Sequence, residues 1–180
     1  MNLHDQSSEI RALFDQPGLA ELGTQSRDAA ISVAEINSSF AKSASDDHKV
    51  ELLRAAALLW NDHLDEAHRI VQEIEDADGS LLHAIMHRRE PDYSNAKYWF
   101  RRVGRHPSFQ KLARLASEIA SNEPGLSSFG MIEGNNWNAL AFVDACEAAG
   151  RGKLKAESIR ALKRIQAAEM RCIVEGFLSS

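Results

Sequence analysis

A short pattern recurs once along the chain, and this internal repeat constrains the fold more than any other feature. Residues 58–67 and 87–96 align with an offset of 29 residues. The offset pairs Leu64 with Tyr93, Ala67 with Ala96, Ile70 with Trp99 and Val71 with Phe100. Self-similarity of this kind is typical of stacked helix–turn–helix units. The sequence therefore predicts two tandem α-hairpins over about 48–105, packed in a manner similar to tetratricopeptide repeats.

Capping residues fit the ends of these hairpins. Asp62 and Asp92 can each cap the second helix of a hairpin, and Ser80 can cap the helix between them. Gly79 and Gly104 follow predicted helix ends, where a residue with positive φ commonly stops a helix. We therefore expect the second hairpin to begin at about residue 80 and to end at Gly104.

The rest of the chain is also expected to be helical, because Val, Ile and Thr are sparse compared with Ala, Leu, Glu, Lys and Arg. Apolar residues at helical spacing predict helices over about 6–15, 27–41, 48–60, 108–121 and 153–177, and one more ending near 149. The Gly- and Ser-rich segment 125–135 is the longest predicted loop, and no convincing strand is present. A chain of 180 residues has the size of one domain. We expect a single all-α domain over 1–180, a compact bundle of about seven or eight helices.

Neither end nor middle of the chain carries a targeting or membrane signal. Residues 1–14 include acids and lack the apolar run of a signal peptide, and no stretch approaches the roughly 18 apolar residues of a membrane span. The two cysteines, Cys146 and Cys172, fall in apolar helical stretches and are expected to be buried thiols. The predicted location is the cytoplasm.

Charge is distributed unevenly between the two halves of the chain. Residues 1–80 hold 6 basic and 16 acidic residues, a net charge of −10, whereas residues 81–180 hold 15 and 10, a net charge of +5. Eight basic residues fall within 83–114: Arg88, Arg89, Lys97, Arg101, Arg102, Arg105, Lys111 and Arg114. This basic segment can serve an anionic ligand, or it can dock onto the acidic half of the same chain.

Five of the seven histidines fall within 44 residues, around the two hairpins: His63, His68, His83, His87 and His106. On one helix His83, His87 and Glu90 have the spacing i, i+4 and i+7, which places them on one face. Two imidazoles at that spacing can reach one ion, and His63 or His68 could join them, with Asp62 or Glu90 as a carboxylate. We therefore expect a possible site for a divalent metal such as zinc. The alternative is that these histidines only form hydrogen bonds between helices, or titrate in water.

The next helix carries a second polar stripe. Asn95, Tyr98 and Arg102 have the spacing i, i+3 and i+7. An amide, a phenol and a guanidinium can together hold a carboxylate or phosphate. Together with His83, His87, Arg88 and Glu90 these residues form the candidate ligand-binding set, although the same stripe could instead tether a neighbouring helix.

The segment GSLLHAIMHRREPDYSNAKYWFRRVGRHP, residues 79–107, follows NDHLDEAH at residues 61–68. It resembles a family of small bacterial and fungal helical proteins to which no activity is assigned. The resemblance is concentrated in residues 58–107, with a weaker echo at 137–147. It implies that the hairpin is the hallmark of that family, and it implies no reaction or ligand.

Two classes of function remain open, and the sequence does not decide whether the protein is an enzyme. The first is an α-hairpin binding or interaction module that recognises an acidic peptide or small anion through His, Arg and Tyr side chains. The alternative is a metal-dependent or acid/base enzyme that uses His63, His68, His83, His87 and Glu90 on a small anionic substrate. Nucleic acid is the least favoured partner, because half of the chain is strongly acidic. Neither a Gly-x-Ser-x-Gly elbow nor a Gly-rich phosphate loop is present. A homo-oligomer is possible through the apolar end of the last helix.

Overall fold

The computed structural model describes residues 3–15, 17–41 and 48–179, and the side chains from residue 8 onward. Within these residues the fold is all-α, as predicted, with ten helices and one two-stranded hairpin. The helices are α1 (Leu3–Ala12), α2 (Val33–Phe40), α3 (His48–Trp60), α4 (Leu64–Val71), α5 (Ala77–Arg89), α6 (Tyr93–Val103), α7 (Ser108–Ala120), α8 (Pro124–Ser127), α9 (Ala139–Gly150) and α10 (Ala156–Ser179). The strands are β1 (Ile132–Glu133) and β2 (Asn136–Trp137). None of the described helices is both long and apolar enough to cross a membrane.

The internal repeat is a structural repeat. Helices α3 and α5 each have 13 residues, and both their first and their last residues are 29 positions apart. The turns that follow have the same backbone path: His63 and Asp92 both have a φ of −92°, with ψ of 70° and 73°. The residues before them, Asp62 and Pro91, both have positive φ. The two hairpins α3–α4 and α5–α6 are therefore copies of one unit.

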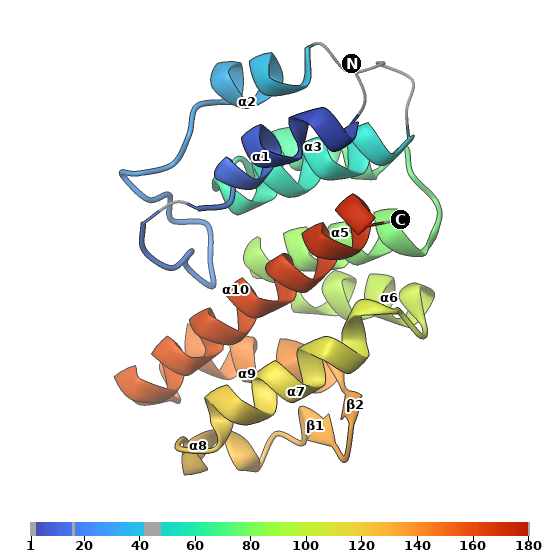
Figure 1. Cartoon of the computed structure of the whole chain (residues 1–180). Coiled ribbons are helices and arrows are strands. Elements are labelled where there is room, and N and C mark those ends of the chain that lie inside the picture. Colours follow the sequence, from blue (N-terminus) through green and yellow to red (C-terminus); the bar gives the residue numbers. More distant parts are fainter. Residues whose placement is uncertain (1–2, 16, 42–47, 180) are drawn as a thin grey trace.

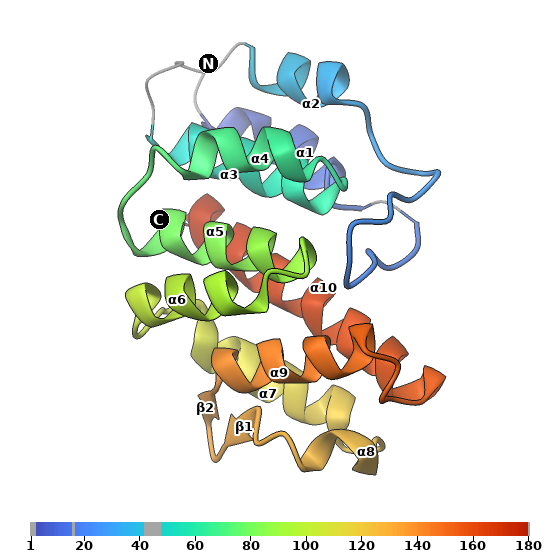
Figure 2. The same ribbon diagram turned by 180° about the vertical axis from the view of Figure 1, so that it is seen from behind.

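The hairpins are stacked, and the long helix α10 holds the stack together. Figures 1 and 2 show α4, α5, α6 and α9 in successive rows, with α10 crossing the other side of the stack next to α7. The core is filled by Leu, Ile, Ala, Met and Phe from all these helices. The apolar residues near the end of α10, including Ile173, Val174 and Phe177, are buried in this core rather than left open for a second copy. Cys146 and Cys172 are buried free thiols, as expected.

The start of α5 differs from the prediction. The helix begins at Ala77, and its cap is Asp76, whose carboxylate accepts a hydrogen bond from the backbone N–H of Gly79 at 2.8 Å. Gly79 therefore lies in the first turn of α5 and does not end a helix, and Ser80 is not a cap. A side chain on Gly79 would stand 2.3 Å from the backbone oxygen of Ile74, so the residue is needed for close packing and not for a left-handed turn.

The cap of α6 was predicted correctly, whereas that of α4 was not. Asp92 accepts from the backbone N–H of Asn95 at 3.1 Å, and Gly104 ends α6 with a φ of 63°. The equivalent turn before α4 has no side-chain cap, because Asp62 is occupied by two arginines described below. Asp62 pairs with arginines from other parts of the chain in place of a capping bond to the backbone of α4.

Two further predictions need correction. The helix expected over 27–41 begins only at Val33, where Ser32 and Glu35 form a capping box. The segment expected to be a loop, 125–135, contains most of α8 and the first strand of a β-hairpin. Ile132 pairs with Trp137 and Glu133 with Asn136, and Gly134 between them has positive φ. Strands of two residues are too short to leave an alternating pattern in the sequence.

Candidate metal centre

Three histidines from two hairpins meet at the seam between α4, α5 and α6. His68 comes from α4, and His83 and His87 lie one turn apart on α5. Each offers a ring nitrogen, and the three nitrogens all lie within 4.8 Å of one another. The Nε2 atoms of His68 and His83 are only 3.1 Å apart. His83 and His87 are 4 % and 6 % exposed, and His68 is half-buried.

Two rings of this cluster of His68, His83 and His87 are stacked, those of His83 and His87. His83 lies nearly parallel to His87, with ring centroids 4.8 Å apart, and nearly parallel to Trp99 of α6 at 4.0 Å. The guanidinium carbon of Arg102 lies 5.1 Å from the Trp99 ring centroid. The stack restricts the rotation of His83, so its two nitrogens keep defined directions in the folded protein.

The histidines on α5 are held in the neutral form. Burial is the main cause that lowers the pKa of His83 to about 4, and repulsion from the neighbouring His87 and His68 contributes to the same shift. Burial also lowers the pKa of His87, against the opposing attraction of Glu90. A neutral imidazole is the form that binds metal ions. These two histidines are therefore ready to act as ligands at neutral pH.

Two polar neighbours orient His87. The side-chain amide of Asn95 donates a hydrogen bond to Nε2 at 3.1 Å, which leaves the ring proton of the neutral form on Nδ1. Glu90 Oε2 lies 3.3 Å from Nδ1. A carboxylate on the outer nitrogen of a histidine fixes its tautomer and makes the other nitrogen a better metal ligand.

Neither protein-family models, nor curated proteins, nor solved structures match this chain. The resemblance to a family of small helical proteins stays a prediction.

The cluster fits a small metal ion. With metal–nitrogen bonds of about 2.1 Å and tetrahedral angles, two ligand nitrogens lie roughly 3.4 Å apart. The His68–His83 separation of 3.1 Å is already close to that value, and the third nitrogen has to move inward by less than about 1.5 Å. Nδ1 of His83 is also buried without a hydrogen-bond partner. Buried polar atoms without a partner are few in folded proteins, and a functional role or a bound ion is one explanation for them.

The structure brings together only part of the predicted metal set. His63 does not join the cluster: its Nε2 is 2.7 Å from the backbone oxygen of Ile31, on the far side of the turn before α4. His106 is also engaged elsewhere, with Nε2 2.7 Å from Asp78 and Nδ1 2.7 Å from the Ser108 hydroxyl. Of the two open choices, His68 is therefore the histidine that faces His83 and His87.

Arg88, predicted as a ligand-binding residue, is instead part of the core. It is fully buried, and its guanidinium bonds both carboxylate oxygens of Glu169 on α10 at 3.1 and 2.5 Å. Its guanidinium carbon lies 4.5 Å from the ring centroid of Phe142. The charge is thus neutralised inside the protein and is closed to an outside ligand.

Arg89 is buried in the same way. It donates to Asp62 Oδ1 and to the backbone oxygen of Leu59, both at 2.7 Å. Asp62 also accepts from the backbone and the guanidinium of Arg27, and these bonds outweigh its burial and hold the pKa of its carboxyl below the usual value. This ion pair ties α5 to the turn between α3 and α4.

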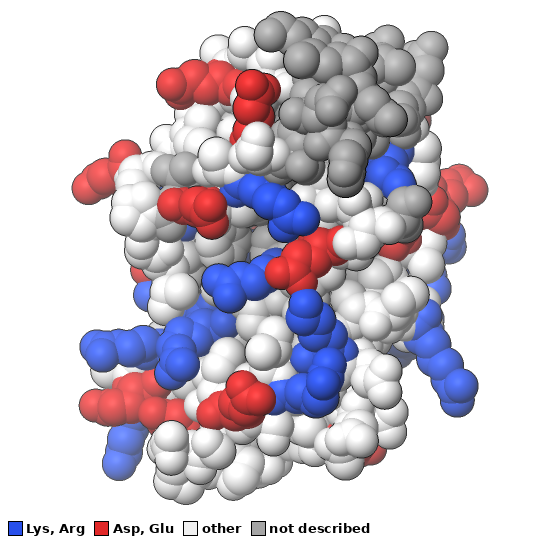
Figure 3. Space-filling view, in the orientation of Figure 1, with Lys and Arg blue, Asp and Glu red and all other residues white. Residues whose placement is uncertain are grey.

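The predicted basic segment is therefore not one patch. Lys97 pairs with Asp144, and Lys111 pairs with Glu175. Arg88 and Arg89 pair with Glu169 and Asp62. Of these four acidic partners only Asp62 lies in the acidic half of the chain, residues 1–80. Most of these basic residues therefore do not dock onto the acidic half. Figure 3 shows basic and acidic side chains interleaved on the face that carries α7 and α10.

The stripe Asn95, Tyr98 and Arg102 divides between the cluster and the surface. Asn95 turns toward His87, whereas Tyr98 is 52 % exposed and Arg102 is exposed beside Trp99. Trp99, which the sequence indicated only as a core residue, lies at the site, because its ring stacks on His83. No local pattern in the sequence links Trp99 to α5.

Proposed function

We propose that the protein binds a divalent transition-metal ion, such as zinc, through His68, His83 and His87. The observation that carries the proposal is the convergence of three imidazole nitrogens within 4.8 Å, with the two on α5 buried and kept neutral. Nitrogen ligands of this kind suit zinc, copper, nickel and iron, whereas magnesium and calcium prefer oxygen.

A purely structural role explains the cluster less well. One proton shared between the Nε2 atoms of His68 and His83 joins these two rings, but it does not engage His87. Burying imidazoles where apolar side chains would pack without penalty costs free energy. A metal ion would bind one lone pair of each ring, with the Asn95 amide turned away from Nε2 of His87, and would thereby account for the burial of the pair on α5.

Three protein ligands leave one position open on a four-coordinate ion. Structural zinc sites close all four positions with protein groups, whereas sites that bind water or substrate keep one free. An ion held here would supply Lewis acidity and could lower the pKa of a bound water. An open position of this kind suits a metal-dependent enzyme or a receptor for a small anion.

Metal binding is tested by stripping the purified protein with a chelator and titrating it with Zn²⁺ and with Co²⁺, whose absorption spectrum reports coordination. We expect one ion per chain and a spectrum of tetrahedral type. The double variant His83→Ala/His87→Ala should lose the ion. His48→Ala is the matched control, because His48 lies outside the cluster and is exposed, and it should bind as the wild type does.

The variant His68→Gln guards against a folding defect in the double variant. His68 is half-buried, so the variant should fold. Loss of a residue that only hydrogen-bonds a metal ligand typically weakens metal binding by roughly 10–100-fold. Because His68 is itself a proposed ligand, the affinity of His68→Gln for the ion should fall by more than that. Wild-type protein that takes up no stoichiometric ion, or a folded His68→Gln variant of unchanged affinity, would overturn the proposal.

A further inference from the structure

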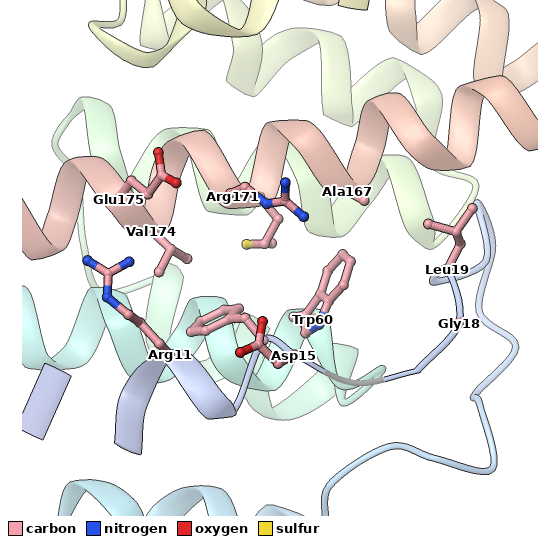
Figure 4. Close-up of a pocket in the computed structure, with 11 residues that line it drawn as sticks. Arg11, Asp15, Gly18, Leu19, Trp60, Ala167, Arg171, Val174 and Glu175 are labelled. Atoms are coloured by element: carbon pink, nitrogen blue, oxygen red, sulfur yellow. The ribbon is translucent and has the colours of Figure 1, made fainter. Parts of the chain in front are cut away.

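A second site lies between α1 and α10, and it shares no residue with the histidine cluster. It is a cavity of about 450 Å³ bounded by α1, by Phe14, Asp15, Gly18 and Leu19 after it, by the last residue of α3 and by the middle of α10 (Figure 4). Volumes of this size are typical of small-molecule sites.

The walls of the cavity are apolar. They are formed by Phe14, Leu19, Trp60, Ala167, Met170 and Val174. Trp60, Met170 and Val174 are buried in the core, which makes the wall along α3 and α10 rigid. An aromatic or branched aliphatic group is the chemistry that such a wall binds.

The rim of the cavity is charged, and most of its charges are unpaired. No hydrogen bond or ion pair between described residues involves the side chain of Arg11, Asp15 or Arg171. Figure 4 shows the guanidinium of Arg171 and the carboxylate of Asp15 directed into the space between α1 and α10. The fourth rim charge, Glu175, is neutralised by Lys111 of α7. The rim thus offers two cations and one anion to a ligand.

We propose that this cavity binds a free α-amino acid with a bulky apolar side chain. The carboxylate of the ligand pairs with Arg171 and is drawn further by Arg11, while its ammonium group pairs with Asp15. The side chain of the ligand lies on Trp60, Met170 and Phe14. A simple fatty or aromatic acid would leave Asp15 facing its carboxylate, and a simple amine would leave the two arginines unpaired, so a zwitterion complements the rim best.

Binding is measured by calorimetry, and by the fluorescence of Trp60, with three ligands that differ by one charged group: L-phenylalanine, phenylpropionate and phenethylamine. We expect L-phenylalanine to bind with a Kd on the order of 0.1–1 mM, as befits a ligand of this size. Each of the other two should bind about tenfold more weakly or worse, since each lacks one charge-assisted hydrogen bond. Trp60→Phe should remove the fluorescence change.

Two variants connect each charge of the ligand to its residue. In Asp15→Asn the preference for L-phenylalanine over phenylpropionate should vanish, because the ammonium group has lost its partner. In Arg171→Gln both carboxylates should weaken about tenfold while phenethylamine is unaffected. Arg164→Gln is the matched control, an exposed arginine on α10 outside the cavity, and it should bind as the wild type does.

Three results would overturn the proposal: no binding of L-phenylalanine at millimolar concentration, equal binding of all three ligands, or a preference for the zwitterion that survives in Asp15→Asn. All three charged positions are at the exposed rim, so the variants should fold. Because the histidine cluster takes no part, the outcome is independent of whether the protein binds a metal.

Discussion

In metal-free protein, His83 should make stability fall as the pH falls below neutrality. An unfolded chain takes up a proton on this residue near its ordinary pKa of 6.5, whereas the folded protein does so only near pH 4. Between these values the unfolded state binds more protons, so each step down in pH favours unfolding. The stabilisation is fully present above pH 6.5 and is lost as the pH falls through 4.

The size of the effect follows from the shift. A lowering of the pKa from 6.5 to about 4 corresponds to roughly 3 kcal/mol once both states are protonated. Between pH 7 and pH 5 the loss from His83 alone is about 2 kcal/mol, because the folded state is still almost unprotonated at pH 5. His83 is 4 % exposed, so solvent does not weaken the effect much.

The assay is urea unfolding at several pH values between 7 and 4.5, in the presence of a chelator. His83→Phe keeps an aromatic ring against Trp99 but cannot take up a proton, so its stability should fall by about 2 kcal/mol less than that of the wild type between pH 7 and 5. If His83→Phe and the wild type lose stability in parallel, the assignment of a neutral, buried imidazole to His83 is wrong.

Three other predictions follow from the packing of α5. Arg88→Met should lower the free energy of unfolding by about 3–5 kcal/mol, because it leaves Glu169 buried and unpaired. The double variant Arg88→Met/Glu169→Leu should recover most of that loss in chemical unfolding. Additive losses in the double variant would contradict the ion pair. Gly79→Ala should cost about 3 kcal/mol by driving a methyl group against Ile74, whereas a helix position with free space would be stabilised by the same change. Glu90→Gln should weaken the binding of Zn²⁺ about 10–100-fold in a competitive titration while leaving one site per chain, and unchanged affinity would show that the carboxylate does not act on His87.

The sequence by itself determined the features that depend on helical periodicity. The offset of 29 residues predicted both hairpins, although the start of α5 was placed too late, and the spacing of His83, His87 and Glu90 placed them on one face of the helix. Asp92 and Gly104 were recognised as helix ends for the same reason. These relations reach only a few residues along the chain, where the geometry of the backbone leaves little choice.

Tertiary structure alone decided which side chains met across helices. Five residues separate His63 from His68, yet the first bonds Ile31 and the second faces His83, because the turn before α4 points the first away from α5. The charge pattern of the sequence predicted Arg88 as part of a basic segment. In the fold Arg88 is buried and bonds Glu169, which lies 81 residues further along the chain. Burial and charge pairing depend on neighbours that the fold supplies. An arginine can therefore bind a ligand when it is exposed to water, or form a buried ion pair when it lies in the core.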